Sequence, residues 1–161
     1  MRGVVVRQEE LLEVKSGEEP AVLNLDIDVA GASSPEGLFD AISGAMDFPE
    51  YFGRNWDALN ECFSDYFIVE DGGLGSEFGG REGVHAQAVR LRFLHSTGLL
   101  RHGDGLLRSL MRVLRYTVKA TSGRRAADLH VVFQLDPTDS AESATLLNEV
   151  VNTEWAKVKL Q

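Results

Sequence analysis

Residues 48–63, FPEYFGRNWDALNECF, join an aromatic loop to the first turns of a helix. Asn55 is a favoured helix N-cap residue, and Asp57 follows in the first turn, where the helix dipole stabilises a carboxylate. Because Asp57 and Glu61 are four residues apart, the helical period places them on one face. Two interpretations are open at this point: a solvated helix face, or two carboxylates that bind a cationic partner.

The helical period also separates an apolar side of this segment from a polar side, with Trp56 at the boundary. The apolar side, expected in the core, comprises Leu59, Cys62, Phe63 and Tyr66. The polar side, expected to face outward, comprises Asp57, Asn60, Glu61, Ser64 and Asp65. Tyr51 and Phe52 precede it across Gly53. Aromatic anchors beside fixed charges are typical of a binding hot spot, which favours the second interpretation.

Upstream, residues 21–30 alternate between apolar and polar side chains, which predicts a strand with one wet face. Ser34 followed by Pro35 and Glu36 predicts a helix start. An apolar stripe then recurs at helical spacing and comprises Leu38, Ala41, Ile42, Ala45 and Met46.

Downstream, Val89, Leu91 and Phe93 alternate with arginines and predict a second strand that ends near His95. Residues 104–120 predict a helix with an apolar face and a basic face. The apolar run 129–135 predicts a central strand buried on both faces. Residues 138–161 predict a terminal helix that packs through Trp155.

Strands that alternate with helices predict an α/β fold, a small and mostly parallel sheet packed with helices. We expect one domain over residues 1–161, with its core at about 21–135. Residues 1–20 are an N-terminal extension in which Val4–Val6 and Leu11–Val14 could form edge strands or a hairpin. The glycine-rich residues 71–83 are expected to form a long loop or insertion.

Composition narrows the functional classes. The 161 residues carry 25 Asp and Glu against 16 Lys and Arg, a net charge of -9, which argues against direct binding to nucleic acid or anionic membranes. Cys62 is the only cysteine, so no intramolecular disulfide or cysteine-based metal cluster can form. Neither a secretory signal nor a membrane-spanning run is expected, and the cytoplasm is the expected compartment.

Signals of catalysis are weak. The four histidines share no metal-binding spacing, and Cys62 lies on an apolar helix face, where a thiol is inert. A carboxylate pair used in acid and base catalysis needs one acid in apolar surroundings, whereas Asp57 and Glu61 both lie on the wet face. We therefore expect no enzyme activity, no catalytic residue, no metal and no cofactor.

The run from Pro49 to Phe63 resembles the signature of the barstar family of ribonuclease inhibitors. In that signature a Pro-Glu-Tyr-Tyr-Gly loop leads into a helix that begins Asn-x-Asp-Ala-Leu and carries a second acid four residues after the first. The order of elements from Ala21 to Leu135 also fits the three-stranded parallel sheet of that family. The N-terminal extension, the glycine-rich segment and the last helix lie outside the resemblance.

The resemblance implies that Asp57 and Glu61 bind the active site of a ribonuclease, with Glu61 in place of the scissile phosphate. It implies a partner-binding set of Tyr51, Phe52, Gly53, Asn55, Trp56, Asp57, Asn60, Glu61, Ser64 and Asp65. The sequence departs from the family where Glu61 replaces an aspartate and Asn60 a frequent tryptophan. It departs most in helix 104–120. The family has an acidic contact residue on this helix, whereas this sequence has Val118 near the expected position and a stripe of basic residues. That stripe comprises Arg108, Arg112, Arg115 and Lys119.

These observations predict an inhibitor, antitoxin or immunity protein whose partner is a basic ribonuclease or related nuclease toxin. The alternative is a barstar-like interaction or regulatory module whose partner is not a nuclease. The basic stripe and the terminal helix favour the alternative. The sequence leaves the oligomeric state open.

Overall fold

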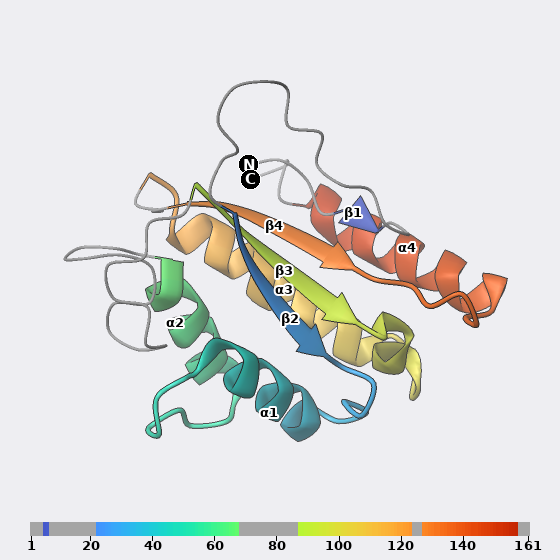
Figure 1. Cartoon of the computed structure of the whole chain (residues 1–161), viewed down its shortest axis with the longest axis horizontal. Coiled ribbons are helices and arrows are strands. Elements are labelled where there is room, and N and C mark those ends of the chain that lie inside the picture. The colour runs from blue at the N-terminus through green and yellow to red at the C-terminus, as the bar shows by residue number, and fades with distance from the viewer. Residues whose placement is uncertain (1–4, 7–21, 68–86, 124–126, 158–161) are drawn as a thin grey trace.

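A computed structural model describes residues 5–6, 22–67, 87–123 and 127–157 (Figure 1). Strands and helices follow one another in the predicted order, with one additional 3-10 helix that was not predicted, and this confirms the α/β class. The elements are β1 (Val5–Val6), β2 (Val22–Asp28), α1 (Pro35–Met46), α2 (Trp56–Phe67), β3 (Ala88–Leu94), the 3-10 helix η1 (Ser96–Leu100), α3 (Gly105–Ala120), β4 (Asp128–Phe133) and α4 (Ala141–Ala156). Among these described elements, no helix is long and apolar enough to cross a bilayer.

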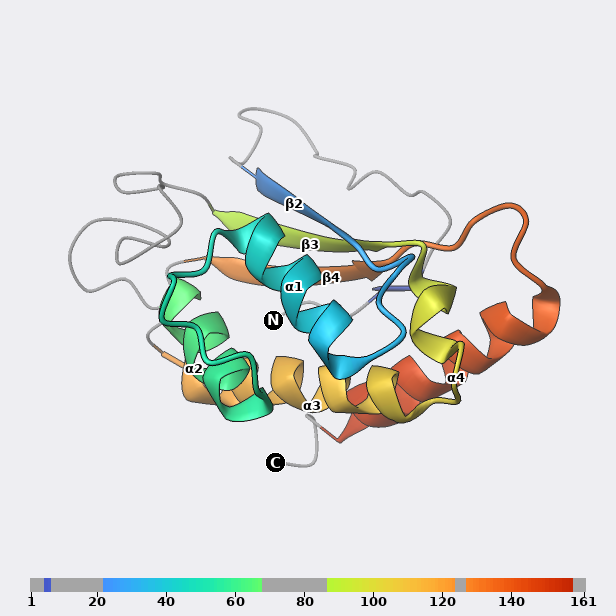
Figure 2. The same cartoon turned by 90° about the horizontal axis from the view of Figure 1, so that it is seen from below.

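The strands form one parallel sheet in the order β1-β4-β3-β2. β2, β3 and β4 are the three predicted strands. β1 pairs with β4 over two residues, so the predicted run Val4–Val6 does supply a short edge strand. The second predicted run, Leu11–Val14, and the glycine-rich residues 71–83 lie outside the described residues. Because each crossover between parallel strands has the same hand, the helices gather on one face of the sheet, as Figure 2 shows.

The strands bury alternate side chains beneath these helices. In β4, Leu129, Val131 and Phe133 are buried, whereas His130 and Val132 are only partly buried. The prediction that this strand is buried on both faces is therefore wrong. The reason is that all the described helices lie on the same face of the sheet, so its other face receives no helix from them.

The start of α1 agrees with the predicted cap, and α4 is capped in the same way. The Ser34 side chain accepts a hydrogen bond from the Gly37 amide at the start of α1, and Ser140 caps α4 through Ser143. Phe39 joins the predicted apolar stripe of α1 as a fully packed residue. In α4, the predicted Trp155 packs against the core, together with buried residues on the same face.

Candidate functional site

The loop from residue 47 to residue 55 joins α1 to α2 and has a defined backbone. Asp47 and Arg54, near its two ends, adopt left-handed conformations with φ of 50° and 51°. Inside the loop, the Phe52 amide donates a hydrogen bond to the Pro49 carbonyl at 2.9 Å. Arg54 forms an exposed ion pair with Asp40 of α1 at 2.9 Å. Such a surface pair contributes little stability, but it links the end of the loop to α1.

An aromatic cluster beneath the loop, made of Phe39, Phe48, Phe52, Trp56 and Phe63, holds the loop on both helices. The Phe39 ring meets Phe52 edge to face with centroids 6.2 Å apart and Trp56 at 4.9 Å. Phe48 meets Phe52 at 5.1 Å and Phe63 at 6.1 Å. Each such pair is worth about 0.5–1.5 kcal/mol beyond the area it buries. The cluster therefore fixes the position of the loop relative to α1 and α2.

The predicted cap at Asn55 starts α2. Its Oδ1 accepts the Ala58 amide at 2.8 Å, and its Nδ2 donates to the Gly53 carbonyl at 3.3 Å. A Cβ at Gly53 would lie 3.1 Å from that Nδ2, so a larger residue there would press on the Asn55 amide and make it shift by a few tenths of an ångström. Asn55 thus satisfies a free amide of the helix and also fastens the preceding loop.

The two carboxylates of interest lie on the exposed side of this fixed helix. Asp57 and Glu61 are both exposed, and Asp57 occupies the first turn of α2. Within the residues that the structure describes, neither forms an ion pair or a hydrogen bond through its side chain. Asp65, one turn further along, is also exposed. The structure thus brings the predicted acids together on one surface.

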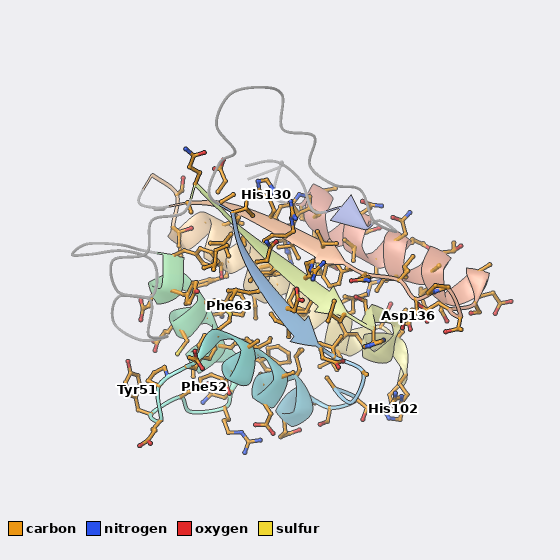
Figure 3. All side chains as sticks on the ribbon, viewed as in Figure 1. Tyr51, Phe52, Phe63, His102, His130 and Asp136 are labelled. Atoms are coloured by element: carbon orange, nitrogen blue, oxygen red, sulfur yellow. The ribbon has the colours of Figure 1, made fainter. Side chains whose placement is uncertain are left out.

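The three predicted aromatic contact residues differ in exposure. Tyr51 is 76% exposed at the tip of the loop, whereas Phe52 and Trp56 are partly buried in the aromatic cluster. Figure 3 shows Tyr51 on the outer side of the loop, with Phe52 beside it and Phe63 further in. Tyr51 is therefore the aromatic group offered to solvent. Phe52 and Trp56 mainly support it.

Ser64 departs from the prediction. It is only 6% exposed, and within the described residues its hydroxyl has no hydrogen-bond partner. Asn60 is partly buried, and its Oδ1 also lacks a described partner. The physical reason is that α2 packs against other parts of the fold, so its buried arc is wider than its apolar residues alone predict. The outward-facing assignment of Ser64 is wrong, and that of Asn60 holds only in part.

Two of the four basic residues on α3 pair with a buried acid of α4 that the sequence did not single out. Glu154 of α4 is 3% exposed, and its carboxylate lies 3.0 Å from Arg108, 3.2 Å from Arg115 and 2.9 Å from Lys157. Burial raises the pKa of Glu154, but the hydrogen bonds from Lys157 and Arg108 outweigh it, so this pKa lies below its ordinary value. The signal was available, because Glu154 continues the helical spacing of the buried Leu147 and Val151.

The histidines and the cysteine form no reactive group in the described part of the chain. Figure 3 shows His102 and His130 far from each other, and no group of three potential metal ligands occurs among the described residues. His95 pairs with Asp136 at 2.7 Å on the surface. Burial, with the charges of Asp65 and Glu61, raises the pKa of the Cys62 thiol to about 11, so the thiol stays protonated and inert at neutral pH.

The site thus consists of a rigid aromatic loop, a capped helix and two exposed carboxylates. Comparison with known families gives a match that spans this site. The family model for barstar, the barnase inhibitor, matches residues 22–134. A search of curated proteins found no match to the chain.

Proposed function

The chain belongs to the barstar family, and on that premise we propose that it is an inhibitor or immunity protein of a ribonuclease or related nuclease toxin. In this proposal α2 and the loop at residues 47–55 enter the active site of the nuclease and block it. The chain catalyses nothing itself, uses no cofactor and acts in the cytoplasm. The partner is a protein, so no direct contact with nucleic acid or membrane is needed.

One observation carries this proposal: Asp57 and Glu61 are exposed and unpaired within the described residues, yet they stand on a tightly fixed scaffold. An exposed acid that only faces solvent needs no rigid support, because solvated or paired surface carboxylates contribute little to stability. Here the Asn55 cap and the aromatic cluster fix the backbone before any partner binds, so less conformational entropy is lost on association. This arrangement favours a binding role over a solvated face.

The chemistry of a nuclease active site suits this pair. A site that binds a phosphodiester presents cationic and hydrogen-bond-donating groups, and a rigid carboxylate satisfies the same groups. Glu61 takes the place of the phosphate, while Asp57 gains from the N-terminal end of the helix dipole. The net charge of -9 also attracts a basic enzyme over distance and raises the rate of encounter.

We assign different roles to the residues of the proposed surface. Tyr51, Gly53, Asp57, Glu61 and Asp65 meet the partner directly. Three further residues hold them in place, with minor direct contact: Phe52, Asn55 and Trp56. Asn60 contributes at the margin, and Ser64 lies inside the fold and supplies no contact.

The test is an RNA-cleavage assay with purified small secreted ribonucleases, barnase among them, at low and high salt. We expect stoichiometric inhibition by the native chain and its loss in Asp57→Asn/Glu61→Gln, which keeps the shape and removes the charge. For buried interfacial charge pairs, the barnase complex of this family being one of the measured cases, losing one partner costs about 2–5 kcal/mol.

Ser64→Ala is the matched control on the same helix and should leave inhibition unchanged. Failure to inhibit any of these ribonucleases, or inhibition that does not depend on the two acids, would contradict the proposal.

A second candidate is a barstar-like regulatory module with a non-nuclease partner. The observation that favours it is the exposed part of the basic stripe, Arg112 and Lys119, which does not suit a uniformly basic nuclease. The same assay separates the two candidates, because a module of this kind leaves RNA cleavage unaffected.

A further inference from the structure

Helix α3 lies between α2 and α4 and contacts both of them (Figure 2). Arg108 and Arg115 form ion pairs with the buried Glu154 on α4. Arg112 and Lys119 are exposed, and neither has an ion pair within the described part of the chain. Two cations of α3 thus remain available to a partner.

A tyrosine stands between these two cations. Tyr116 is 49% exposed, one of three large hydrophobic residues that are exposed in the described part of the chain. Arg112, Tyr116 and Lys119 follow one another at spacings of four and three, so they share one face of α3. We call these three residues the α3 face. Tyrosine and arginine are among the residue types enriched in the energetic centres of protein interfaces.

The direction of Tyr116 is set by the helical period. It follows Arg115 by one residue and is therefore rotated by about 100° around the axis of α3. Arg115 points toward α4, where it meets Glu154. Tyr116 is therefore turned away from α4, toward the side of α3 on which α2 lies. Within the α3 face, Tyr116 is thus the residue nearest to α2, the helix that carries Asp57 and Glu61.

We propose that the α3 face extends the acidic surface of α2 into one docking surface of mixed charge, whose partner is a ribonuclease with carboxylates beside its cationic active site. This inference rests on the proposed function and adds to it the charge pattern of the partner. A nuclease that is basic over the whole contact area would be repelled by Arg112 and Lys119. Opposed charges in neighbouring patches also fix the orientation of the complex and exclude the wrong partners.

The three side chains supply complementary interactions. Arg112 can bind a carboxylate with two parallel hydrogen bonds, whereas Lys119 acts as a point charge. Tyr116 has a flat apolar ring with a polar tip, so it gains contact area while few rotamers are lost. The partner surface that fits them is a shallow apolar patch with acidic side chains at its rim.

The experiment measures the affinity of purified, catalytically inactivated small secreted ribonucleases that differ in the charge around their active sites. Arg112→Glu/Lys119→Glu and Tyr116→Ala should each weaken the best-bound ribonuclease at least tenfold, and Tyr116→Phe should remain within threefold of the native chain. Asp57→Asn/Glu61→Gln is measured in parallel and reports on the proposed function alone. Thermal unfolding of each variant verifies that it is folded.

A zero-length carbodiimide cross-link gives an independent readout, because it joins an amine only to a carboxylate in direct contact. We expect Lys119 to cross-link to an Asp or Glu of the bound ribonuclease, and Lys119→Arg to abolish the link while keeping the affinity. The internal pair of Lys157 and Glu154, 2.9 Å apart, serves as the positive control.

Two results would overturn the inference while the proposed function stands. One is a charge-reversed α3 face that binds every Asp57-dependent ribonuclease as tightly as the native chain or more tightly. The other is a best partner that has no carboxylate within reach of Lys119. If no ribonuclease depends on Asp57 and Glu61, the proposed function fails and the inference fails with it.

Discussion

Two carboxylate sites in this molecule are built in opposite ways. On α2, Asp57 and Glu61 are exposed and have no ion pair within the described residues, although their backbone is firmly held. On α4, Glu154 is almost fully buried and meets three cations. The difference shows that an acid's role follows from its burial and partners, since the same residue type serves recognition in one place and structure in the other.

The contrast has an energetic basis. A buried carboxylate is costly to desolvate, and only well-placed cations offset that cost, so Glu154 and its partners depend on one another. An exposed carboxylate costs little on folding and keeps its full charge for a partner. Removing the first kind should therefore weaken the fold, and removing the second kind should weaken only binding.

The largest effect on stability is expected from Glu154→Ala. Loss of one partner from a buried ion pair costs about 3–5 kcal/mol. Arg108 and Lys157 are partly exposed and can be rehydrated, so we expect about 2–4 kcal/mol less unfolding free energy in urea denaturation. Glu149→Ala, an exposed acid on the same helix, and Asp57→Ala/Glu61→Ala should each stay within about 0.5 kcal/mol of the native chain. Equal losses of unfolding free energy in Glu154→Ala, Glu149→Ala and the α2 double variant would disprove the difference between buried and exposed acids.

The contrast should also depend on pH. The pKa of Glu154 lies below its ordinary value of 4.5, so its contribution is complete above that pH and is lost as the pH falls through the folded-state pKa. The difference in unfolding free energy between the native chain and Glu154→Gln should therefore be constant near neutral pH and shrink in acid. A difference that grows on acidification would contradict the ion-pair explanation.

A smaller effect on the free energy of unfolding is expected in the aromatic cluster that supports the helix carrying the exposed acids. Phe39→Leu removes two edge-to-face contacts, with Phe52 and Trp56, and should lower the unfolding free energy by about 1–3 kcal/mol. It should also weaken binding of a ribonuclease, because the loop loses its fixed position. Phe133→Leu, which removes a stacked contact with Phe93 inside the sheet, is the matched control. It should lower stability comparably and leave affinity unchanged; equal losses of affinity would disprove a specific role for the cluster.

Much of the fold followed from local patterns. The alternation in residues 21–30, the cap at Ser34 and the period of α2 each report on one element, and the structure confirms these three predictions. The predicted cap at Asn55 and the exposure of Asp57 and Glu61 have the same origin. For these residues, position on their own helix was sufficient for the prediction.

The errors concern contacts between elements. Ser64 is polar and lies on the expected outer side of α2, but the fold buries it, and the period of α2 carries no information about what packs against that helix. In the same way, nothing in residues 104–120 indicates that Arg108 and Arg115 share a glutamate 39 or more residues further along. Tertiary packing decides which polar residues remain on the surface.

The smallest effect is expected at a third carboxylate, which lies between the two extremes. Asp136 is partly exposed and has one charged partner, His95, at 2.7 Å. The hydrogen bond and charge of Asp136 raise the pKa of His95, with smaller contributions from Asp28 and Asp139. A raised pKa means that this pair stabilises the fold below about pH 6.5 and that the contribution disappears as the pH rises through the folded-state pKa.

His95 has a left-handed backbone with φ of 55°, so His95→Asn is the appropriate substitution, since asparagine tolerates that conformation. We expect His95→Asn to lower the melting temperature slightly at pH 5.5 and not at pH 8.5, and an NMR titration of the native chain to give a pKa for His95 above the ordinary value. His102→Asn, at an exposed histidine without a described ion pair, should show no such dependence. If His95→Asn lowered the melting temperature equally at pH 8.5, His95 would support the turn before η1 by its shape and not by its charge. Asp136 would then contribute no ion pair to stability, like the exposed acids of α2.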